Sequence, residues 1–222
     1  MIFTNRQEAG RVLAERLGKY ANREDVVVLG VPRGGVPVAF EVASALGVPL
    51  DIFVLRKLGV PGHEELAFGA IGSGGARVLN TDVVNKLGVS EQEIAVATKE
   101  EARELERRER LYRGNRPPLN VEGFTVILVD DGIATGASLR VAIQALRKLR
   151  PAALVVATPV APRTTYHSLR PEVDDLVCAR IPDPFYGVGQ FYEDFSQVSD
   201  EEVIALLERA QGPRAASKAS AA

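Results

Sequence analysis

Cysteine, histidine, methionine and tryptophan are scarce in this 222-residue chain, which has one cysteine, two histidines, one methionine and no tryptophan. The single thiol, Cys178, excludes an internal disulfide bond. Cys178, His63 and His167 are also too few side chains for a structural zinc site, which needs a tetrahedral set of such ligands. Other side chains must therefore carry the function.

Long apolar runs and an excess of one charge are also missing. No run approaches the length needed to cross a bilayer, and the N-terminus lacks the charged-then-apolar pattern of a signal peptide, so we expect a cytoplasmic protein with no membrane partner. The net charge of −2 argues against a protein that holds nucleic acid through bulk positive charge. An apolar fraction of 46% is enough for a core, and we predict one domain at 1–211 and a disordered, low-complexity tail at 212–222.

The strongest functional pattern runs from Val126 to Leu139 and reads VILVDDGIATGASL. Its first four residues are typical of a strand buried on both faces in a parallel sheet, and apolar residues recur at helical spacing from Leu139 onward. A small-residue loop between strand and helix leaves backbone N–H groups free to bind a phosphate. Asp130 and Asp131 cannot bind that phosphate, but they suit sugar hydroxyls or a metal carried by the ligand. The pattern therefore indicates a phosphorylated ribose.

This segment resembles the phosphoribosyl-pyrophosphate (PRPP) motif of the type I phosphoribosyltransferases, in which a hydrophobic strand precedes two acids, three variable residues, T-G or A-G and a hydroxyl residue. The resemblance implies that Asp130 and Asp131 hold the ribose 2′- and 3′-hydroxyls and contact a metal indirectly, through PRPP or water. It also implies that the 5′-phosphate loop consists of Ala134, Thr135, Gly136, Ala137 and Ser138. The alternative is an ordinary βα turn whose aspartates cap the helix.

A second strand–loop–helix pattern lies nearer the N-terminus. An apolar run at 26–29 is followed by GVPRGGVP, and Pro37 can open the next helix at Val38. Taken alone, a Gly-Gly turn at this point is common. In the resembled family this place belongs to the pyrophosphate loop, which implies a cis peptide near Pro32–Arg33 and backbone contacts from Arg33, Gly34 and Gly35. The alternative is a plain turn.

Two cations, Arg56 and Lys57, follow a predicted strand at 50–55. The Gly- and Pro-broken segment after them, 58–66, resembles the flexible loop that closes the active site in this family. Displacement at an anomeric carbon passes through an oxocarbenium-like state that water would capture, so closure is expected. Lys57 and Arg33 are candidates to neutralise charge on the leaving pyrophosphate. Arg56 and the loop histidine are lesser candidates, and that histidine could equally be a solvated residue.

The C-terminal part concentrates aromatic residues, because five of the thirteen Phe and Tyr residues lie between Phe185 and Phe195. Rings on irregular backbone suit the stacking of a flat base. In the family a small hood supplies the base site, and we expect it at about 159–195. The base-binding candidates are Phe185, Tyr186, Phe191, Tyr192 and Asp194. The alternative is a locally packed aromatic cluster over the end of the sheet.

Two helices carry capping signals. The sequence SEQE at Ser90 opens a charged helix that runs to about Arg113, and its interleaved charges predict a solvated face or the interface of a homodimer. The sequence SDEE at Ser199 opens a closing helix that runs to Ala210.

Together these patterns predict a three-layer α/β/α fold with a mostly parallel sheet, a flexible loop and a small hood. The resemblance implies Mg²⁺-dependent transfer of 5-phosphoribose from PRPP to a nitrogenous acceptor, such as a nucleobase in nucleotide metabolism, with release of pyrophosphate. Its catalytic residues would be Lys57, Arg33 and Asp131. Ala134 stands where hypoxanthine-guanine enzymes have an aspartate near the base, so the acceptor is undetermined. A PRPP- or nucleotide-sensing regulator on the same fold and a phosphosugar hydrolase are the alternatives.

Overall fold

A five-stranded parallel sheet forms the centre of the molecule. The computed structural model describes residues 2–60 and 63–211, with the backbone alone at 63–66. The strand order is β2-β1-β6-β7-β8, and every neighbouring pair is parallel. The strands are β1 (Val26–Gly30), β2 (Leu50–Ile52), β6 (Thr125–Val129), β7 (Ala153–Val160) and β8 (Asp175–Arg180). Every residue of β1 and β6 is buried, as their continuous apolar runs predicted.

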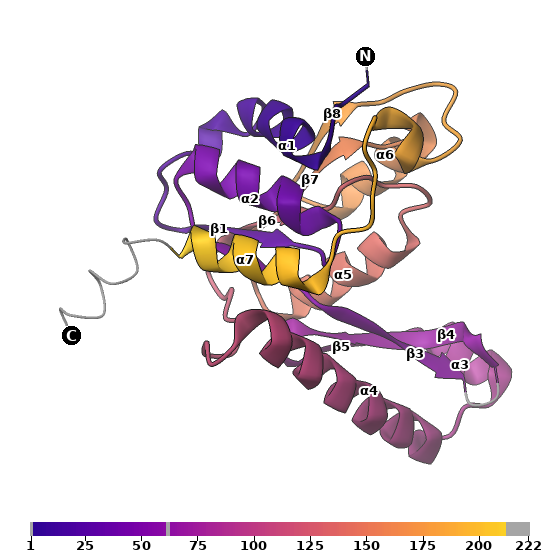
Figure 1. The fold of residues 1–222 in the computed structure, drawn as a ribbon. Helices are drawn as coiled ribbons and strands as arrows, with labels where there is room; N and C mark the ends of the chain where they lie inside the picture. The colour runs from indigo at the N-terminus through magenta and orange to yellow at the C-terminus, as the bar shows by residue number, and fades with distance from the viewer. Residues whose placement is uncertain (1, 61–62, 212–222) are drawn as a thin grey trace.

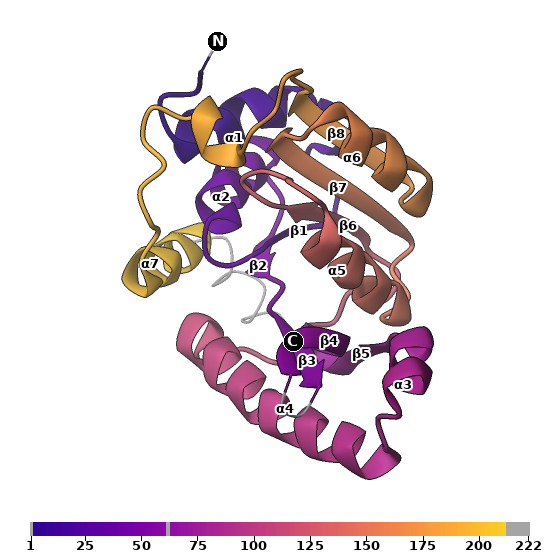
Figure 2. The same cartoon turned by 90° about the vertical axis from the view of Figure 1, so that its right-hand side faces the viewer.

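Helices cover both faces of this sheet, which confirms the predicted three-layer fold (Figure 2). One face carries α1 (Arg6–Glu15), α2 (Gly35–Leu46) and α7 (Asp200–Ala210), and the other carries α5 (Ala137–Lys148) and α6 (Arg163–Leu169). Each face has its own hydrophobic core, because successive strand residues point to opposite faces. Val28 and Ile127 belong to the first core, whereas Leu29 and Leu128 belong to the second.

A smaller antiparallel sheet lies beside the central one. It consists of β3 (Leu55–Val60), β4 (His63–Gly72) and β5 (Ala76–Leu79). This sheet, together with α3 (Thr81–Leu87) and the long α4 (Glu91–Arg113), forms what we term the small lobe, residues 55–113 (Figure 1). The C-terminal end of α4 lies near α7, so the small lobe is joined to the helices of the main body (Figure 1).

The small lobe corrects two predictions. The strand predicted at 50–55 is divided between β2 and β3, because the chain leaves the central sheet at Phe53 and Val54. The Val54 N–H donates to Ser73 Oγ at 2.9 Å, and the Ser73 N–H donates to Val54 O at 3.0 Å, which fixes this crossing. The loop predicted at 58–66 is largely a β-hairpin, with an irregular register at Gly59, and only 61–62 lie outside the described backbone. Arg56 and Lys57 therefore lie inside a strand and not at its end.

The capping predictions are confirmed. At α4 the Glu93 N–H donates to Ser90 Oγ at 3.2 Å, and the Ser90 N–H donates to Glu93 Oε2 at 2.8 Å. At α7 the Glu202 N–H donates to Ser199 Oγ at 3.2 Å. By contrast, α2 begins at Gly35 and not at Val38, because a proline in the first helical turn needs no N–H partner.

The N-terminal residues pair with the chain's aromatic segment, which we define as residues 181–195. The Phe3 N–H donates to Phe191 O at 2.8 Å, and the Glu193 N–H donates to Phe3 O at 2.8 Å. Short 3₁₀ turns complete the fold: η1 (Gly18–Tyr20), η2 (Ser73–Gly75), η3 (Arg170–Glu172) and η4 (Val188–Phe191), the last within the aromatic segment.

Two further predictions concern the hood and the C-terminal tail. The range predicted for the hood, 159–195, contains β8, which belongs to the central sheet. The tail predicted to be disordered, 212–222, lies outside the described residues. Among the helices that the structure describes, none combines the length and apolar character of a membrane span.

Candidate active site

Two loops meet at the carboxyl edge of the central sheet because their strands are neighbours. Strands β1 and β6 pair in parallel with Gly30 opposite Val129, so the chain leaves both strands at the same level. The Val31 N–H then donates to Val129 O at 2.9 Å. A Cβ on Gly35 would lie 2.7 Å from Val129 O and 3.0 Å from Asp130 Cα. The expected pyrophosphate loop and the expected PRPP motif are therefore in direct contact.

Gly34 makes the closest part of this contact. A Cβ on Gly34 would lie 2.1 Å from Asp131 Oδ2, so the side chain of any other residue would displace the carboxylate. The peptide bond between Pro32 and Arg33 is cis, as the family resemblance led us to expect. The glycine pair is thus required by the approach of the two loops, and a plain turn would not require it.

The acid pair, Asp130 and Asp131, lies half-buried at this edge, and the charges of its two carboxylates favour the binding of a hydrogen-bond donor or a cation. Burial raises the pKa of Asp130 well above its ordinary value, and the charge of Asp131 raises that pKa further. Burial also raises the pKa of Asp131, and the Arg6 guanidinium opposes that rise. Two adjacent desolvated carboxylates gain stability from hydroxyl donors or from a cation that a ligand supplies. A ribose carrying a metal–phosphate group would provide both.

Arg6 is a residue of this site that the sequence did not lead us to predict. Its Nε donates to Asp131 Oδ2 at 2.8 Å, and its Nη1 donates to Ser196 O at 2.7 Å. The side chain is buried even though it lies in the first turn of α1. One signal was available, because Arg6 lies three and seven residues before Ala9 and Leu13 and so shares their buried stripe.

The predicted phosphate loop, 134–138, leads into the N-terminus of α5. Gly136 has a φ of +76°, a backbone conformation that would be strained in a residue with a side chain. Four of the five loop residues are exposed. The loop is held from behind by Thr165, whose Oγ1 donates to Ala134 O at 2.8 Å. An exposed loop at the start of a 12-residue helix presents N–H donors and the positive end of the helix dipole.

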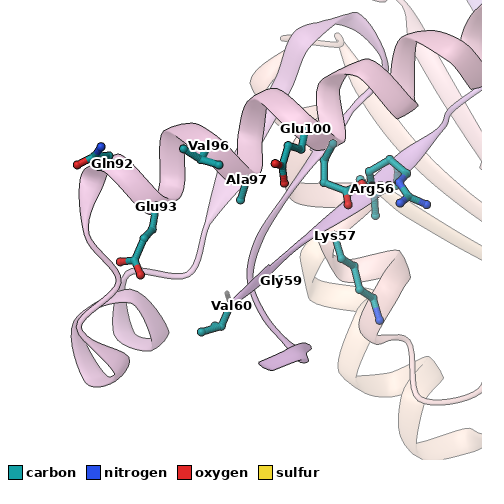
Figure 3. A pocket seen from close by; sticks show the side chains of 11 residues that line it. Arg56, Lys57, Gly59, Val60, Gln92, Glu93, Val96, Ala97 and Glu100 are labelled. Atoms are coloured by element: carbon teal, nitrogen blue, oxygen red, sulfur yellow. Dashed lines mark hydrogen bonds and ion pairs between the residues drawn. The ribbon is translucent and has the colours of Figure 1, made fainter. Parts of the chain in front are cut away.

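The predicted cations are not gathered at the acid pair. Arg33 Nη1 lies 3.8 Å from Asp200 Oδ1, and Arg56 Nε lies 2.6 Å from Glu101 Oε2. Neighbouring residues of a strand point to opposite faces, and Lys57 accordingly points away from α4 (Figure 3). No hydrogen bond or ion pair within the described chain joins Lys57 to Asp130 or Asp131. The side chain of His63, a lesser candidate, lies outside the described residues.

One cavity of the described structure lies away from the acids. It has a volume of about 720 Å³ and lies between β3 and α4, where Arg56, Val60 and Val96 contribute to its walls (Figure 3). Neither acid lines it. The cavity therefore belongs to the small lobe and not to the edge where the two loops meet.

The aromatic segment lies against the predicted PRPP motif. A Cβ on Gly132 would lie 2.2 Å from Val188 Cγ1, and the Tyr192 hydroxyl donates to Asp131 O at 2.6 Å. Phe185 stacks on Phe191 with ring centroids 5.6 Å apart. These contacts place the predicted base-binding segment next to the predicted ribose site.

The five base-binding candidates differ in exposure. Tyr186 is 85% exposed, whereas Tyr192 is buried and stacks on Phe195 with ring centroids 5.0 Å apart. Asp194 is exposed, and its Oδ1 accepts a hydrogen bond from the Ser196 N–H at 2.9 Å. Tyr192 therefore supports the acid pair, and the partly or fully exposed rings of Phe185, Tyr186 and Phe191 are the ones that a flat ligand could reach.

The donor set fits a metal that arrives with the substrate. Within the described residues no cluster of three or more His, Cys, Asp or Glu side chains could hold an ion by itself. The two adjacent carboxylates could complete the shell of a Mg²⁺ ion whose other oxygen ligands come from phosphate, hydroxyl or water.

Comparison with known proteins agrees with this geometry. The model of the phosphoribosyl transferase domain matches residues 2–195. Two proteins of Mycobacterium tuberculosis, from strains CDC 1551 and H37Rv and provisionally named as phosphoribosyl transferases, are each 46% identical over 209 residues, or 94% of this chain. The chain spans 47% of the length of these relatives. The crystal structure of the protein TT1426 from Thermus thermophilus is similar with a TM-score of 0.81 and 40% identity, over 94% of this chain and 99% of that one. The matched model, the curated relatives and the meeting of two phosphate-type loops at an acid pair show that the chain belongs to the phosphoribosyltransferase family.

Proposed function

We propose that this chain transfers 5-phosphoribose from PRPP to a nitrogenous acceptor and releases pyrophosphate. The observation that carries the proposal is the contact of the Arg33–Gly35 loop with the Asp130–Asp131 pair, since a Cβ on Gly34 would fall 2.1 Å from Asp131 Oδ2. PRPP has a pyrophosphate next to the ribose hydroxyls, and its two recognition elements must therefore adjoin each other.

Each part of PRPP has a counterpart in the chain. The carboxylates of Asp130 and Asp131 accept hydrogen bonds from the ribose hydroxyls, and the loop at 134–138 binds the 5′-phosphate. Backbone N–H groups of Arg33 and Gly34 bind the pyrophosphate, since the Gly35 N–H already donates to Val31 O at 3.0 Å. The Arg33 guanidinium would screen the pyrophosphate charge. Mg²⁺, when bound with PRPP, would neutralise part of the pyrophosphate charge. The protein thus contributes by positioning the reactants and by stabilising charge on the leaving group.

A nucleobase is the acceptor that we propose. The aromatic segment lies against Gly132 of the PRPP motif and offers the faces of Phe185, Tyr186 and Phe191 for stacking. Lys57 is assigned to the leaving pyrophosphate, which it could approach from the exposed face of β3. Cytoplasmic location and a homodimer stay predictions from the sequence.

One observation favours a second candidate, a protein that senses PRPP or a nucleotide. Arg33 lies near Asp200, and Arg56 pairs with Glu101, so both cations already have carboxylate partners. A sensor would retain the binding loops and use the release of these pairs as its response to the ligand.

Pyrophosphate release from PRPP and Mg²⁺ across a panel of purine and pyrimidine bases tests the proposal. The control is the double variant Asp130→Asn with Asp131→Asn, which keeps the shape of both side chains and removes their charge. We expect release with one base or one class of base in the native protein, and a loss of at least about a hundredfold in the control because charge-assisted hydrogen bonds are lost. Equal turnover in the double variant would refute the ribose assignment. PRPP binding by calorimetry without release with any base would favour the sensor.

A further inference from the structure

Arg6 connects three parts of the site that lie far apart in the sequence. Its Nε donates to Asp131 Oδ2 at 2.8 Å, its Nη1 donates to Ser196 O at 2.7 Å, and its guanidinium carbon lies 4.1 Å from the centre of the Phe195 ring. The same Nε lies 3.4 Å from the position that a Cβ on Gly34 would take. One buried side chain therefore lies beside the acid pair, Gly34 of the pyrophosphate loop, and the residues at and just beyond the end of the aromatic segment.

The contact with Arg6 orients the Asp131 carboxylate. Oδ2 is held between the Arg6 Nε and Gly34, and this leaves Oδ1 as the oxygen without a hydrogen bond in the described chain. The backbone of Asp131 is held independently, because its carbonyl accepts the Tyr192 hydroxyl at 2.6 Å. Asp131 is thus held at both its side chain and its backbone by residues that are themselves joined through the pairing of Phe3 with the aromatic segment.

The chemistry of arginine explains why this residue type is used. A guanidinium presents several N–H donors in a planar fork, so it can bind a carboxylate and a carbonyl together while an aromatic ring covers its face. A lysine ammonium would keep the charge but would lose the planar stacking on Phe195. A glutamine would lose the charge as well.

We propose that Arg6 is a positioning residue for phosphoribosyl transfer, which acts through Asp131 by directing one carboxylate oxygen toward the ribose and by tying the aromatic segment to the pyrophosphate loop. The inference rests on the proposed function, since it takes PRPP as the ligand of Asp131. Arg6 itself is not expected to touch the substrate, because its side chain is buried and its Nε and Nη1 already donate to Asp131 and Ser196.

The chain offers a matched control in Arg113. This arginine is buried to 7% exposure against 8% for Arg6. It likewise pairs with a carboxylate, Asp51, at 2.9 Å and donates to a backbone carbonyl, Pro117 O, at 2.8 Å. It has no contact with the acid pair within the described structure. Substituting either arginine by glutamine removes an ion pair with a carboxylate and a hydrogen bond to a backbone carbonyl, and only one of the two changes affects Asp131.

The experiment measures the affinity of each full-length variant for PRPP with Mg²⁺ by calorimetry, together with KM for PRPP, kcat and thermal stability. We expect Arg6→Gln to weaken PRPP binding by about tenfold to a hundredfold, the usual effect of losing a hydrogen bond to a charged group. KM should rise more than kcat falls, because the lost interaction acts in the bound ground state. Arg6→Lys should have intermediate affinity. Arg113→Gln should lose thermal stability and bind PRPP as the native protein does.

The outcomes separate this inference from the proposed function. If the native protein does not bind PRPP, both are overturned. If the native protein binds PRPP and Arg6→Gln binds it equally well, or Arg113→Gln weakens binding as much as Arg6→Gln does, the positioning role alone is overturned. If Arg6→Gln does not fold, the variants Arg6→Lys and Arg113→Lys are compared instead. Weaker PRPP binding by Arg6→Lys than by Arg113→Lys supports the role, and equal binding refutes it.

Discussion

At the scale of single residues, Gly34 shows how closely the two loops pack. Its φ of −60° and ψ of −32° are those of a helix, so the backbone conformation alone would accept any residue. What excludes a side chain is the Asp131 carboxylate, 2.1 Å from where a Cβ would be. The requirement for glycine is therefore a packing requirement.

Replacing Gly34 by alanine should weaken PRPP binding by about tenfold or more, because small displacements of catalytic groups are costly. The measurement is PRPP affinity by calorimetry. Gly18→Ala is the control, since a Cβ on Gly18 would meet nothing within 4 Å. Native affinity in Gly34→Ala would mean that the carboxylate can move aside without loss of binding.

At the scale of elements, α4 links the small lobe to the Arg33–Gly35 loop. Glu101 on α4 pairs with Arg56 of β3. Near the C-terminal end of α4, the Tyr112 hydroxyl donates to Asp200 Oδ1 at 2.5 Å, and this carboxylate lies 3.8 Å from Arg33. Burial raises the pKa of Tyr112 to about 12, so this hydroxyl keeps its proton at neutral pH. Helix, hairpin and loop are thus connected by polar contacts at the middle and at the C-terminal end of α4.

Asp174 connects the start of β8 to β7 and α5, and its contacts make the stability of the fold depend on pH. Its Oδ2 accepts the Leu154 N–H at 2.7 Å and Arg147 Nη1 at 2.8 Å. These contacts, first the backbone N–H, lower the pKa of Asp174 below its ordinary value. A carboxyl group whose pKa is lower in the folded state than in the unfolded state stabilises the fold at pH values above its unfolded-state pKa. This contribution is lost as the pH falls through the folded-state pKa.

Asp174→Asn should therefore lower the free energy of unfolding by about 1 kcal/mol at pH 7, a hydrogen-bond value reduced for solvent screening. The difference from the native protein should shrink as the pH falls below the unfolded pKa. Urea unfolding of both proteins at pH 7, 5 and 3 measures it. Glu24→Gln, at an exposed carboxylate with no partner in the described structure, should show no such trend. A difference that is constant across this range would contradict the assignment.

At the scale of the whole molecule, the central sheet separates two cores and carries the chain's single thiol near one edge. Cys178 lies in β8 and is 6% exposed. Burial raises the pKa of its thiol to about 11. Because the thiolate is the reactive form, Cys178 should respond slowly to thiol reagents while the fold is intact.

At pH 8, labelling of native Cys178 should be at least about a hundredfold slower than labelling in urea, since a pKa raised this far above the ordinary thiol value of about 8.5 alone lowers the thiolate fraction that much. The rate follows from absorbance with a chromogenic disulfide, and a small free thiol measured in the same urea solutions corrects for solvent effects. Equal rates in the native and unfolded protein would show that β8 opens independently of the rest of the sheet.

The sequence by itself determined the parts of this protein that depend on short windows of chain. The β6–loop–α5 unit follows from an apolar run, a glycine-containing loop and helical spacing, and the caps of α4 and α7 follow from hydrogen bonds that span three residues. The cis peptide at Arg33 followed from the family resemblance, and the structure confirms it.

Only the tertiary structure decided which distant residues meet. Arg6 and Asp131 are 125 positions apart, and Tyr192 and Asp131 are 61 apart; these pairs exist because β1 and β6 are neighbours and because Phe3 pairs with the aromatic segment. The part of the β3–β4 hairpin at 58–66 was predicted as a loop because Gly59 disturbs the alternation that marks a strand, while long-range pairing with β4 supplies the hydrogen bonds. Local hydrogen bonding and periodicity are determined by neighbouring residues, whereas the partner of a buried charge depends on the order of strands in the sheet.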